Sequence, residues 1–501
     1  MADKESLASF DVYPVHMFDD CKGPRSIMMR WIFRVDAQLD ADKLRTAFAQ
    51  VLETGDWRKL AGRLHYTKTA GLEIHVPHVF TEQDPPFTYT HHDHSAELFD
   101  ANPARRTFPR AASGPHVYSR TPAANAAVFA PGVPATLAEH ISRGLPQLGL
   151  HVTTFRDATL MELTWPHTVM DGTGQRDLLA AWSLALAGRA HDIPPLAGAR
   201  EDVPRRMAER YADADADANA RQRLEEDDVM QDRALTGLGK LLFFCRLLWR
   251  LLTSPRADWR VFRLPRAVVA RWREDVEKLP PDLKTGKPPF VSDGDLICAW
   301  LVTLAAAGRS PRPRARYVVA GSVNCRSRIP ALQDGTYVQN LLSLYFASVP
   351  NIGGPGDDSL ARFALAHRAQ VAAQTTETQI LHHFQRRRAE AEAGQRRSVP
   401  LYCRADDVVL MCNNLSGLRI GAAADFGPAV VVVTTAADGT RASGRVVSHY
   451  YLSSDDGNRP TPYFVCLDQD EEGYWIRANA SPGTWERIIR EISAGEAHVH
   501  I

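Results

Sequence analysis

Short apolar or alternating segments recur along the whole chain and predict β-strands in both halves. In the first half, Ser26–Val35 and Thr159–Trp165 have this pattern. The second half contains six such segments: ARYVVAGSVN, LLSLYFASV, DVVLMC, AVVVVTT, YFVCLD and YWIRANA. The stretch Thr81–Pro134 shows little periodicity and is rich in Pro, His, Ala and Thr, so we expect loops there.

Amphipathic helices are predicted between these strands, because apolar residues recur at a spacing of three or four. The first helix follows Asp40 or Asp42, either of which can cap it, and the helix in QRDLLAAWSLALAG ends at Gly188. In the second half, Ser292 is the expected cap of SDGDLICAWLVTLAAAG. SLARFALAHRAQVAAQ and GTWERIIREI are also expected to be helical. Since strands and helices intermix in both halves, the expected fold class is α/β.

The composition changes between residues 193 and 260, where prolines, an Asp-Ala alternation and an apolar segment with two arginines follow one another. We expect this stretch to be a crossover between an N-terminal lobe, residues 1–192, and a C-terminal lobe, residues 261–501. The apolar segment Leu241–Leu252 is too short to span a bilayer. A lid over an apolar acceptor, a helix on a membrane surface and a packed part of the crossover all fit it, and we expect packing.

The overall composition is that of a soluble globular protein. The 59 Lys and Arg residues balance the 59 Asp and Glu residues, so no global field favours nucleic acid or an anionic membrane as a partner. Hydrophobic residues make up 45% of the chain, which excludes general disorder. Seven cysteines, an odd number without a C-x-x-C pair, argue against a disulfide framework. We expect a reduced, cytoplasmic protein without a secretory signal or a transmembrane segment.

The segment PHTVMDGTG, which follows a predicted strand, carries the most informative candidate residues. His167 lies where the strand ends, and a neutral imidazole there suits general-base chemistry on a hydroxyl or amine. Asp171 can orient the histidine directly or pair with a basic residue and fix the turn. Gly172 and Gly174 allow backbone angles that other residues resist. Taken alone, H-x-x-x-D-G is a weak pattern that also fits an ordinary strand-end turn.

Further segments, in order along the chain, resemble the motifs of the BAHD acyltransferases, including the fungal-type members. This is the CoA-dependent acyl transfer family with the chloramphenicol-acetyltransferase-like fold. The segments are AGRL (Ala61–Leu64), PHTVMDGTG, SDGDLICAW, GSVNCRSRIPALQDGTYVQN (Gly321–Asn340) and ADFGPA (Ala424–Ala429). The resemblance implies two similar lobes, each a mixed sheet with flanking helices, joined by the crossover segment.

The resemblance also implies roles for individual residues. His167 is the expected general base for attack on an acyl-CoA thioester, with no covalent acyl-enzyme. Asp171, followed by Gly172, is expected to point away from the site and to pair with Arg326 or, less favourably, Arg328. The motif that contains Asp425 and Gly427 is expected to be structural.

Two departures from the family pattern concern the second half. Pro428 and Ala429 replace the usual Trp-Gly after the D-F-G motif. The family's Thr/Ser-x-Trp triplet upstream of that motif is also absent. Asn413, Asn414 and Ser416 are the candidates that remain there to stabilise an oxyanion or contact the substrate, beside the alternative that they are plain turn residues.

Several other groups of residues favour structural roles. His91-His92-Asp93-His94 contains metal-binding side chains, but adjacent residues rarely converge on one ion, and we expect no metal. Cys325 has no indicated base and is expected to be a buried small side chain. The basic clusters at 308–316 and 385–397 are candidates for the phosphates of CoA, although a solvated face is the expected role.

The sequence thus predicts a monomeric, acyl-CoA-dependent O- or N-acyltransferase that acts on a small secondary metabolite and needs no resident cofactor. A condensation-type enzyme that uses a carrier-protein thioester is one alternative. Pro166 stands where such proteins usually have a second histidine. A non-catalytic binding protein that kept the fold is the other alternative.

Overall fold

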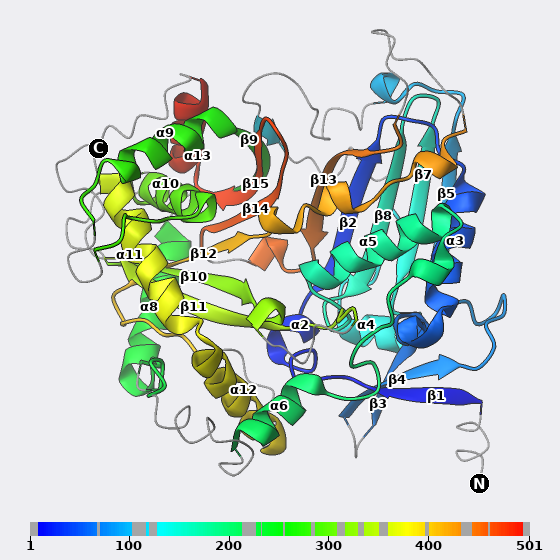
Figure 1. Ribbon diagram of the computed structural model, residues 1–501, viewed down its shortest axis with the longest axis horizontal. Helices are drawn as coiled ribbons and strands as arrows, with labels where there is room; N and C mark the ends of the chain where they lie inside the picture. Colours follow the sequence, from blue (N-terminus) through cyan, green and yellow to red (C-terminus); the bar gives the residue numbers. More distant parts are fainter. Residues whose placement is uncertain are drawn as a thin grey trace.

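The computed structural model arranges the chain as two lobes side by side (Figure 1). It describes residues 9–67, 71–102, 117–119, 128–212, 227–231, 233–253, 256–281, 286–307, 316–328, 335–349, 359–395, 400–431, 443–458 and 461–493. As expected from the sequence, both lobes combine β-sheets with helices, so the fold class is α/β.

The first lobe is built on a five-stranded sheet with the strand order β13-β2-β8-β7-β5. Its pairs are antiparallel except for β5 and β7, which run parallel. The strands are β2 (Met28–Val35), β5 (Thr88–His94), β7 (Gly149–Phe155), β8 (Thr159–Pro166) and β13 (Val446–Ser453). Helices α3 (Ala41–Glu53) and α5 (Gly172–Leu186) cover one face, where Phe48 packs against Trp182 in the core.

The second lobe is built on a seven-stranded sheet with the order β11-β10-β12-β14-β15-β9-β6. The strands are β6 (Val117–Ser119), β9 (Asp258–Pro265), β10 (Tyr317–Asn324), β11 (Leu342–Val349), β12 (Val408–Asn414), β14 (Tyr463–Gln469) and β15 (Gly473–Ala480). One face packs against α9 (Arg266–Glu277), α10 (Asp293–Ala307), α11 (Ser359–Gln374) and α13 (Pro482–Ser493). The opposite face packs against α8 (Gly237–Thr253) through a smaller apolar cluster.

Smaller elements complete the described fold. β1 (Phe10–Pro14), β4 (Gly71–Pro77) and β3 (Arg63–Thr67) form a three-stranded antiparallel sheet. The remaining helices are α2 (Lys22–Arg25), α4 (Leu137–Ser142), α6 (Val203–Ala212) and α12 (Glu377–Glu392), of which α6 and α12 pack together.

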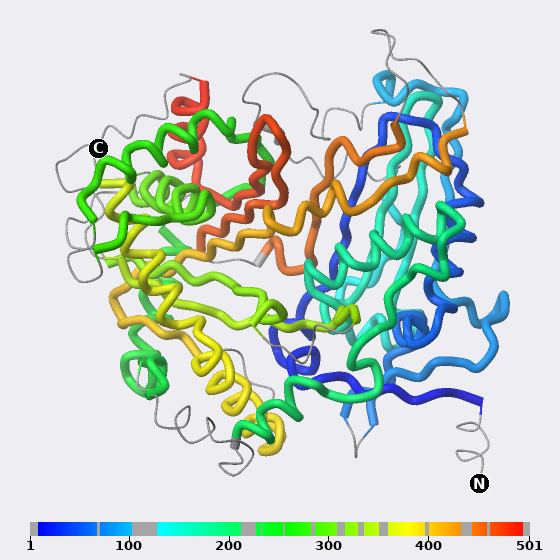
Figure 2. Tube along the Cα trace, in the orientation of Figure 1, coloured from blue at the N-terminus to red at the C-terminus, as the bar shows by residue number. Residues whose placement is uncertain are grey.

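The two lobes exchange strands. β13 comes from the last quarter of the chain yet pairs with β2 of the first lobe, in register from Val446 opposite Val35. In the other direction, β6 pairs with β9 of the second lobe. Figure 2 shows the orange part of the trace leaving the second lobe, running beside the blue strand and returning. Each sheet therefore contains a strand from a distant part of the chain. The division of the chain into lobes at residues 192 and 260 stays a prediction.

Most expected elements are present. Asp40 caps α3 by accepting from the amides of Asp42 and Lys43, and Gly188, with φ +72°, follows α5 as the expected stop. The loop expectation for Thr81–Pro134 is wrong at β5, an edge strand held by pairing with β7, and at β6, which pairs with β9. Of AVVVVTT, the described residues 429–431 form only a bridge between Val430 and Leu39, and the rest lies outside the described residues.

The expectation that Leu241–Leu252 is packed holds for only one side of the segment. The segment lies in α8, whose only buried side chain is Phe243, because the helix touches the sheet along one narrow stripe. Even so, none of the helices in the described ranges combines the length and the apolar character needed to cross a bilayer.

Candidate active site

The backbone of His167 is fixed by both lobes. The His167 amide donates to the carbonyl of Ile27 (2.9 Å), which leads into β2 of the first lobe. The His167 carbonyl accepts a hydrogen bond from Nδ2 of Asn340 (2.7 Å), which leads into β11 of the second lobe. The histidine that follows β8 therefore lies where the two lobes meet.

The His167 imidazole is half-buried, and the enclosed ring nitrogen is Nδ1, which has no hydrogen-bond partner of normal geometry among the described residues. Burial lowers the pKa of His167 below its ordinary value of 6.5, while Asp171 and Asp455 act in the opposite direction. A lowered pKa keeps the ring neutral near pH 7. The side chain is thus in the protonation state that a general base needs.

Asp171 is buried and acts as the N-cap of α5. Its carboxylate accepts from the amides of Thr173 and Gly174 (3.0 Å each) and from the amide of Leu341 (3.1 Å). Arg326 binds both carboxylate oxygens, at 3.0 Å each. The Asp171 carboxylate is thus hydrogen-bonded to these groups and not to His167.

Arg326, rather than Arg328, is the arginine that pairs with Asp171. Its guanidinium also donates to the carbonyls of Tyr337 (2.8 Å) and Gln339 (2.6 Å), so it fixes the segment that precedes β11. Arg328 donates instead to the carbonyl of Thr375. Arg326 therefore ties the start of α5 to the second lobe.

The glycines of the turn serve close packing rather than unusual backbone angles, which corrects the sequence expectation. Neither Gly172 nor Gly174 has a positive φ. A Cβ atom on Gly174 would lie 2.1 Å from the carbonyl oxygen of Val338, and one on Gly172 would lie 3.3 Å from Leu418. Glycine at position 174 therefore allows the second lobe to approach the start of α5.

A buried polar network lies behind Asn340 and was not anticipated as a group. Asp19 accepts from both the amide and Nδ2 of Asn340 (2.9 and 2.7 Å). Nearby, Lys59 contacts His16 (3.1 Å). Burial raises the pKa of Asp19 and lowers that of Lys59. Asn340 belongs to a motif quoted above, but nothing in the sequence pairs it with Asp19, which lies 321 residues away.

The loop after β12 contains the three candidate oxyanion groups, and their hydrogen bonds differ. Asn413 accepts from the amide and hydroxyl of Ser322 and donates to the Tyr463 hydroxyl (2.8 Å). Ser416 donates its hydroxyl proton to Oδ1 of Asn414 (2.7 Å). The Asn414 side chain is exposed, and its Nδ2 makes none of the hydrogen bonds recorded among the described residues. Asn414 therefore retains a free donor.

Gly294 makes room for Asn414. A Cβ atom at this position, near the start of α10, would lie 2.2 Å from Nδ2 of Asn414. This contact explains the glycine in the SDGDL segment. The same helix start is capped by Ser292, whose hydroxyl and amide bind the Asp295 carboxylate (2.6 and 2.8 Å).

A large cavity, about 790 Å³, lies between β13 of the first sheet and the β14–β15 end of the second. Arg419 lines it with a φ of +48°, the one left-handed backbone among the non-glycine residues described. Such strain is characteristic of functional positions. Arg266, Asp425, Arg445, His449 and Asp468 also line the cavity.

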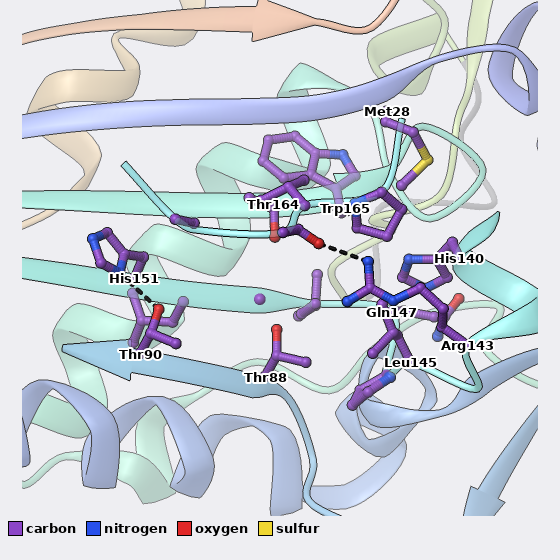
Figure 3. Close-up of a pocket in the computed structure, with 18 of the residues that line it drawn as sticks. Met28, Thr88, Thr90, His140, Arg143, Leu145, Gln147, His151, Thr164 and Trp165 are labelled. Atoms are coloured by element: carbon purple, nitrogen blue, oxygen red, sulfur yellow. Dashed lines mark hydrogen bonds between the residues drawn. The ribbon is translucent and has the colours of Figure 1, made fainter. Parts of the chain in front are cut away.

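A smaller pocket, about 220 Å³, lies within the first lobe and is lined by both apolar and polar side chains (Figure 3). Met28 and Trp165 border it, as do Thr164 and His151, which is hydrogen-bonded to Thr90 (2.6 Å). Burial lowers the pKa of His151 to about 4, so this imidazole is neutral at physiological pH. A mixed lining of this kind suits a small apolar molecule with few polar groups.

The D-F-G motif joins the second half of the chain to the helices of the first lobe. The Asp425 amide donates to the hydroxyl of Ser183 (2.7 Å), and its carboxylate accepts from the Gly427 amide (2.8 Å). The ring of Phe426 is buried edge-on against Trp182, with ring centroids 5.1 Å apart. Pro428 fits at the start of a short 3₁₀ turn that replaces the family's usual continuation.

The other groups singled out in the sequence make contacts of their own. His91 bonds the Thr154 hydroxyl (3.0 Å) and His92 packs on His151. Within the described part of the chain no three His, Cys, Asp or Glu side chains are grouped to hold a metal ion. Burial raises the pKa of the Cys325 thiol to about 12, so it is a poor nucleophile. Residues 308–315 lie outside the described residues, whereas Arg387 and Arg388 of the second cluster pair with Glu390 and Glu392.

Comparison with known proteins gives relatives that cover nearly the whole chain. The O-acetyltransferase PaAT-2 of Phomopsis amygdali is 29% identical over 491 residues, which cover 96% of this chain and 97% of the relative. The acetyltransferase BOT5 of Botryotinia fuckeliana is 28% identical over 507 residues, which cover 97% and 90%. No family model matches the chain.

Among solved structures, TRI101 of F. graminearum, crystallised with coenzyme A and deoxynivalenol, is similar with a TM-score of 0.60. The match covers 96% of this chain and 97% of TRI101, at 12% sequence identity, and therefore concerns the fold. This fold is the two-lobed, chloramphenicol-acetyltransferase-like one. Together, the full-length relatives and this fold identify the chain as an acyltransferase, in agreement with its resemblance to the fungal BAHD type.

Proposed function

We propose that the protein transfers an acyl group, with acetyl as the first candidate, from an acyl-CoA to a hydroxyl group of a small apolar metabolite. The observation that carries this proposal is the position of His167, a neutral, half-exposed imidazole whose backbone is held by both lobes. The names of the full-length relatives support the acetyl group. We further propose that the protein works as a monomer in the cytoplasm and needs no resident cofactor.

The chemistry needs one base and no covalent intermediate. His167 takes the proton from the acceptor hydroxyl as its oxygen forms a bond to the thioester carbonyl carbon. The resulting tetrahedral intermediate collapses with cleavage of the carbon–sulfur bond. The proton on His167 then passes to the CoA thiolate, so the products are the ester and free CoA.

Asn414 is the proposed donor to the oxyanion. Its side chain is exposed and its Nδ2 has no hydrogen-bond partner among the described residues, whereas Asn413 already donates to the Tyr463 hydroxyl and Ser416 to Asn414. A donor aimed at developing charge is worth far more in the transition state than in the ground state. We therefore assign Asn414 as a catalytic residue, and Asn413 and Ser416 as residues that hold the surrounding loop in place.

The cavity between the sheets is the proposed site of the CoA nucleotide. Its volume suits a large ligand, and Arg419 offers an exposed cation on a strained backbone. Arg419→Ala should raise the KM for acyl-CoA several-fold with little change in kcat. Arg189→Ala, which removes an exposed arginine paired with Asp192, is the matched control. An unchanged KM in Arg419→Ala would place the nucleotide elsewhere.

The activity itself is tested by thiol release. Purified protein is incubated with acetyl-CoA and a panel of hydroxylated apolar metabolites, and free CoA and the esterified product are both measured. Ketone analogues of the same acceptors, which lack the hydroxyl, are the matched controls. Release and ester formation only with the alcohols would support the proposal. Failure to bind CoA, or activity only with a carrier-protein thioester, would contradict it.

A further inference from the structure

Helix α8 exposes an unusual concentration of large apolar side chains. Eight of its side chains are at least 43% exposed: Leu238, Leu241, Leu242, Phe244, Leu248, Trp249, Leu251 and Leu252. Soluble monomers seldom expose contiguous apolar patches beyond a few hundred Å², and larger patches mark interaction surfaces. The active-site proposal makes no use of this helix.

The apolar side chains share one side of the helix. Phe243 and Leu247 pack on the second sheet. At about 100° per residue, the eight exposed apolar residues fill roughly the opposite half of the circumference, together with Gly237 and Cys245. No charged residue falls within this outward arc. Lys240 lies beside one margin of the arc and Arg246 beside the other.

The charged residues of α8 itself have one sign. Residues 233–257 contain five basic residues and no acidic residue: Arg233, Lys240, Arg246, Arg250 and Arg256. Two acidic side chains on segments packed against α8 are already neutralised. Asp407 is paired with Arg316 (2.6 and 2.8 Å), and Asp228 is paired with Arg386.

We propose that α8 is a membrane-surface helix that docks the enzyme on anionic lipid. Its outward arc would enter the boundary between headgroups and acyl chains, with Lys240 and Arg246 at the level of the lipid phosphates. The helix has 17 residues, or about 25 Å at 1.5 Å per residue, and lies along the protein surface, so it fits an orientation in the membrane plane.

Charge argues against a second copy of the chain as the occupant. A two-fold pairing of α8 would bring like-charged margins together, and the helix offers no acidic group to pair with them. An anionic bilayer supplies both the apolar interior and the negative charge that the arc and its margins lack. It also makes no demand for shaped pockets or specific hydrogen bonds.

The test is flotation of the full chain with phosphatidylcholine vesicles, prepared with and without phosphatidylserine. We expect wild-type protein to float with the mixed vesicles and to dissociate as salt is raised. The variant Leu241→Gln/Leu248→Gln/Leu252→Gln should bind at least tenfold more weakly. Val79→Gln/Phe290→Gln, which removes apolar side chains that are 72% and 64% exposed elsewhere, is the matched control and should bind like wild type.

A second variant separates the charge from the apolar arc. Lys240→Glu/Arg246→Glu should lose about tenfold or more of the binding to phosphatidylserine vesicles, because each basic residue near an anionic surface contributes to attraction. Circular dichroism and thermal melting establish that each variant is folded. Equal flotation of wild type and the triple leucine variant would overturn the proposal. So would a wild-type dimer, seen by light scattering, that the triple variant converts to monomer.

Discussion

The two loops that meet at the candidate active site use their polar groups in opposite ways. In the turn from His167 to Gly174, the Asp171 carboxylate accepts five hydrogen bonds. In the loop from Asn413 to Ala424, by contrast, Asn414 and Arg419 are exposed, and neither Asn414 Nδ2 nor the Arg419 guanidinium has a recorded partner in the described part of the chain. The first loop is therefore built to be rigid, and the second to receive a ligand.

Physical chemistry gives a reason for this division. A base must be held at a fixed position relative to the acceptor, and the buried, five-fold hydrogen-bonded carboxylate of Asp171 provides rigidity to the turn that contains it. Donors to an oxyanion and to phosphates must remain unpaired until the ligand arrives. Mutations in the first loop should therefore affect stability and rate together, except at His167 itself, whereas removal of the unpaired donors of the second, on Asn414 and Arg419, should affect catalysis or substrate binding alone.

The largest expected effect is that of His167→Ala on the rate. Loss of the base should lower kcat by about two to four orders of magnitude. Thermal stability should change little, because Nδ1, the enclosed nitrogen of the ring, has no hydrogen-bond partner of normal geometry in the described part of the chain. Steady-state kinetics and a melting curve check both outcomes. His191→Ala, at an exposed histidine beside Asp192, is the control. Near-normal kcat in folded His167→Ala protein would refute the mechanism.

The second prediction concerns the pair Asp171 and Arg326. Removing either partner of a buried ion pair typically costs about 3–5 kcal/mol of folding free energy, since the other charge is left buried. Both Asp171→Ala and Arg326→Ala should therefore lower stability and activity together, and the double variant should cost clearly less than the sum. Denaturant unfolding measures the three values.

A surface pair supplies the control for that cycle. Arg189 and Asp192 are 2.7 Å apart but largely exposed, so Arg189→Ala should cost no more than about 1 kcal/mol. Strictly additive losses for Asp171→Ala and Arg326→Ala would show that the two residues do not share an interaction in solution.

Neighbouring asparagines of the second loop offer a sharper comparison. Asn414→Asp should lower kcat by about a hundredfold and leave KM and melting temperature nearly unchanged, because it removes the Nδ2 donor but keeps the oxygen that accepts from Ser416. Asn413→Ala should instead lower stability by about 1–3 kcal/mol, since it removes the hydrogen bonds that join Asn413 to Ser322 and to the Tyr463 hydroxyl. If the two variants showed the same kinetic and thermal behaviour, the assignment of Asn414 would be wrong.

Local parts of the fold were predictable from the sequence because they depend on short-range pattern. The strand that ends at Pro166, the helix capped by Asp40 and the glycine stop at Gly188 all follow from periodicity and capping. The pairing of Asp171 with Arg326 was expected from the family resemblance, and the structure contains that contact.

Features that depend on distant segments were not predictable. β13 joins β2 across more than half the chain, and Asp19 meets Asn340 across 321 residues, so no local pattern signals either contact. The roles of Gly174 and Gly294 also depend on atoms of another segment, the Val338 carbonyl and the Asn414 amide. Only the assembled structure shows that a side chain at position 174 or 294 would clash with these atoms.

The smallest expected effect is the pH dependence that His167 imposes. Burial lowers its pKa, so kcat/KM should rise with pH along a limb whose midpoint lies below 6.5 and should be flat near pH 7. Even an unshifted imidazole is about three-quarters neutral at pH 7, so the change there is less than twofold.

The titration of His167 should also affect the folding stability, and the direction of the effect follows from its lowered pKa. Because the folded pKa lies below the unfolded value of 6.5, the unfolded chain binds the proton first, and stability falls as pH drops below 6.5. His167→Ala should remove this part of the slope in denaturant unfolding measured across pH. Asp19, whose pKa is raised and which contacts Asn340, is the other group near the turn that can titrate in this range. If the acid limb of the kcat/KM profile persists in Asp19→Asn with an unchanged midpoint, that limb belongs to His167. A midpoint above pH 6.5 would contradict a buried, neutral base.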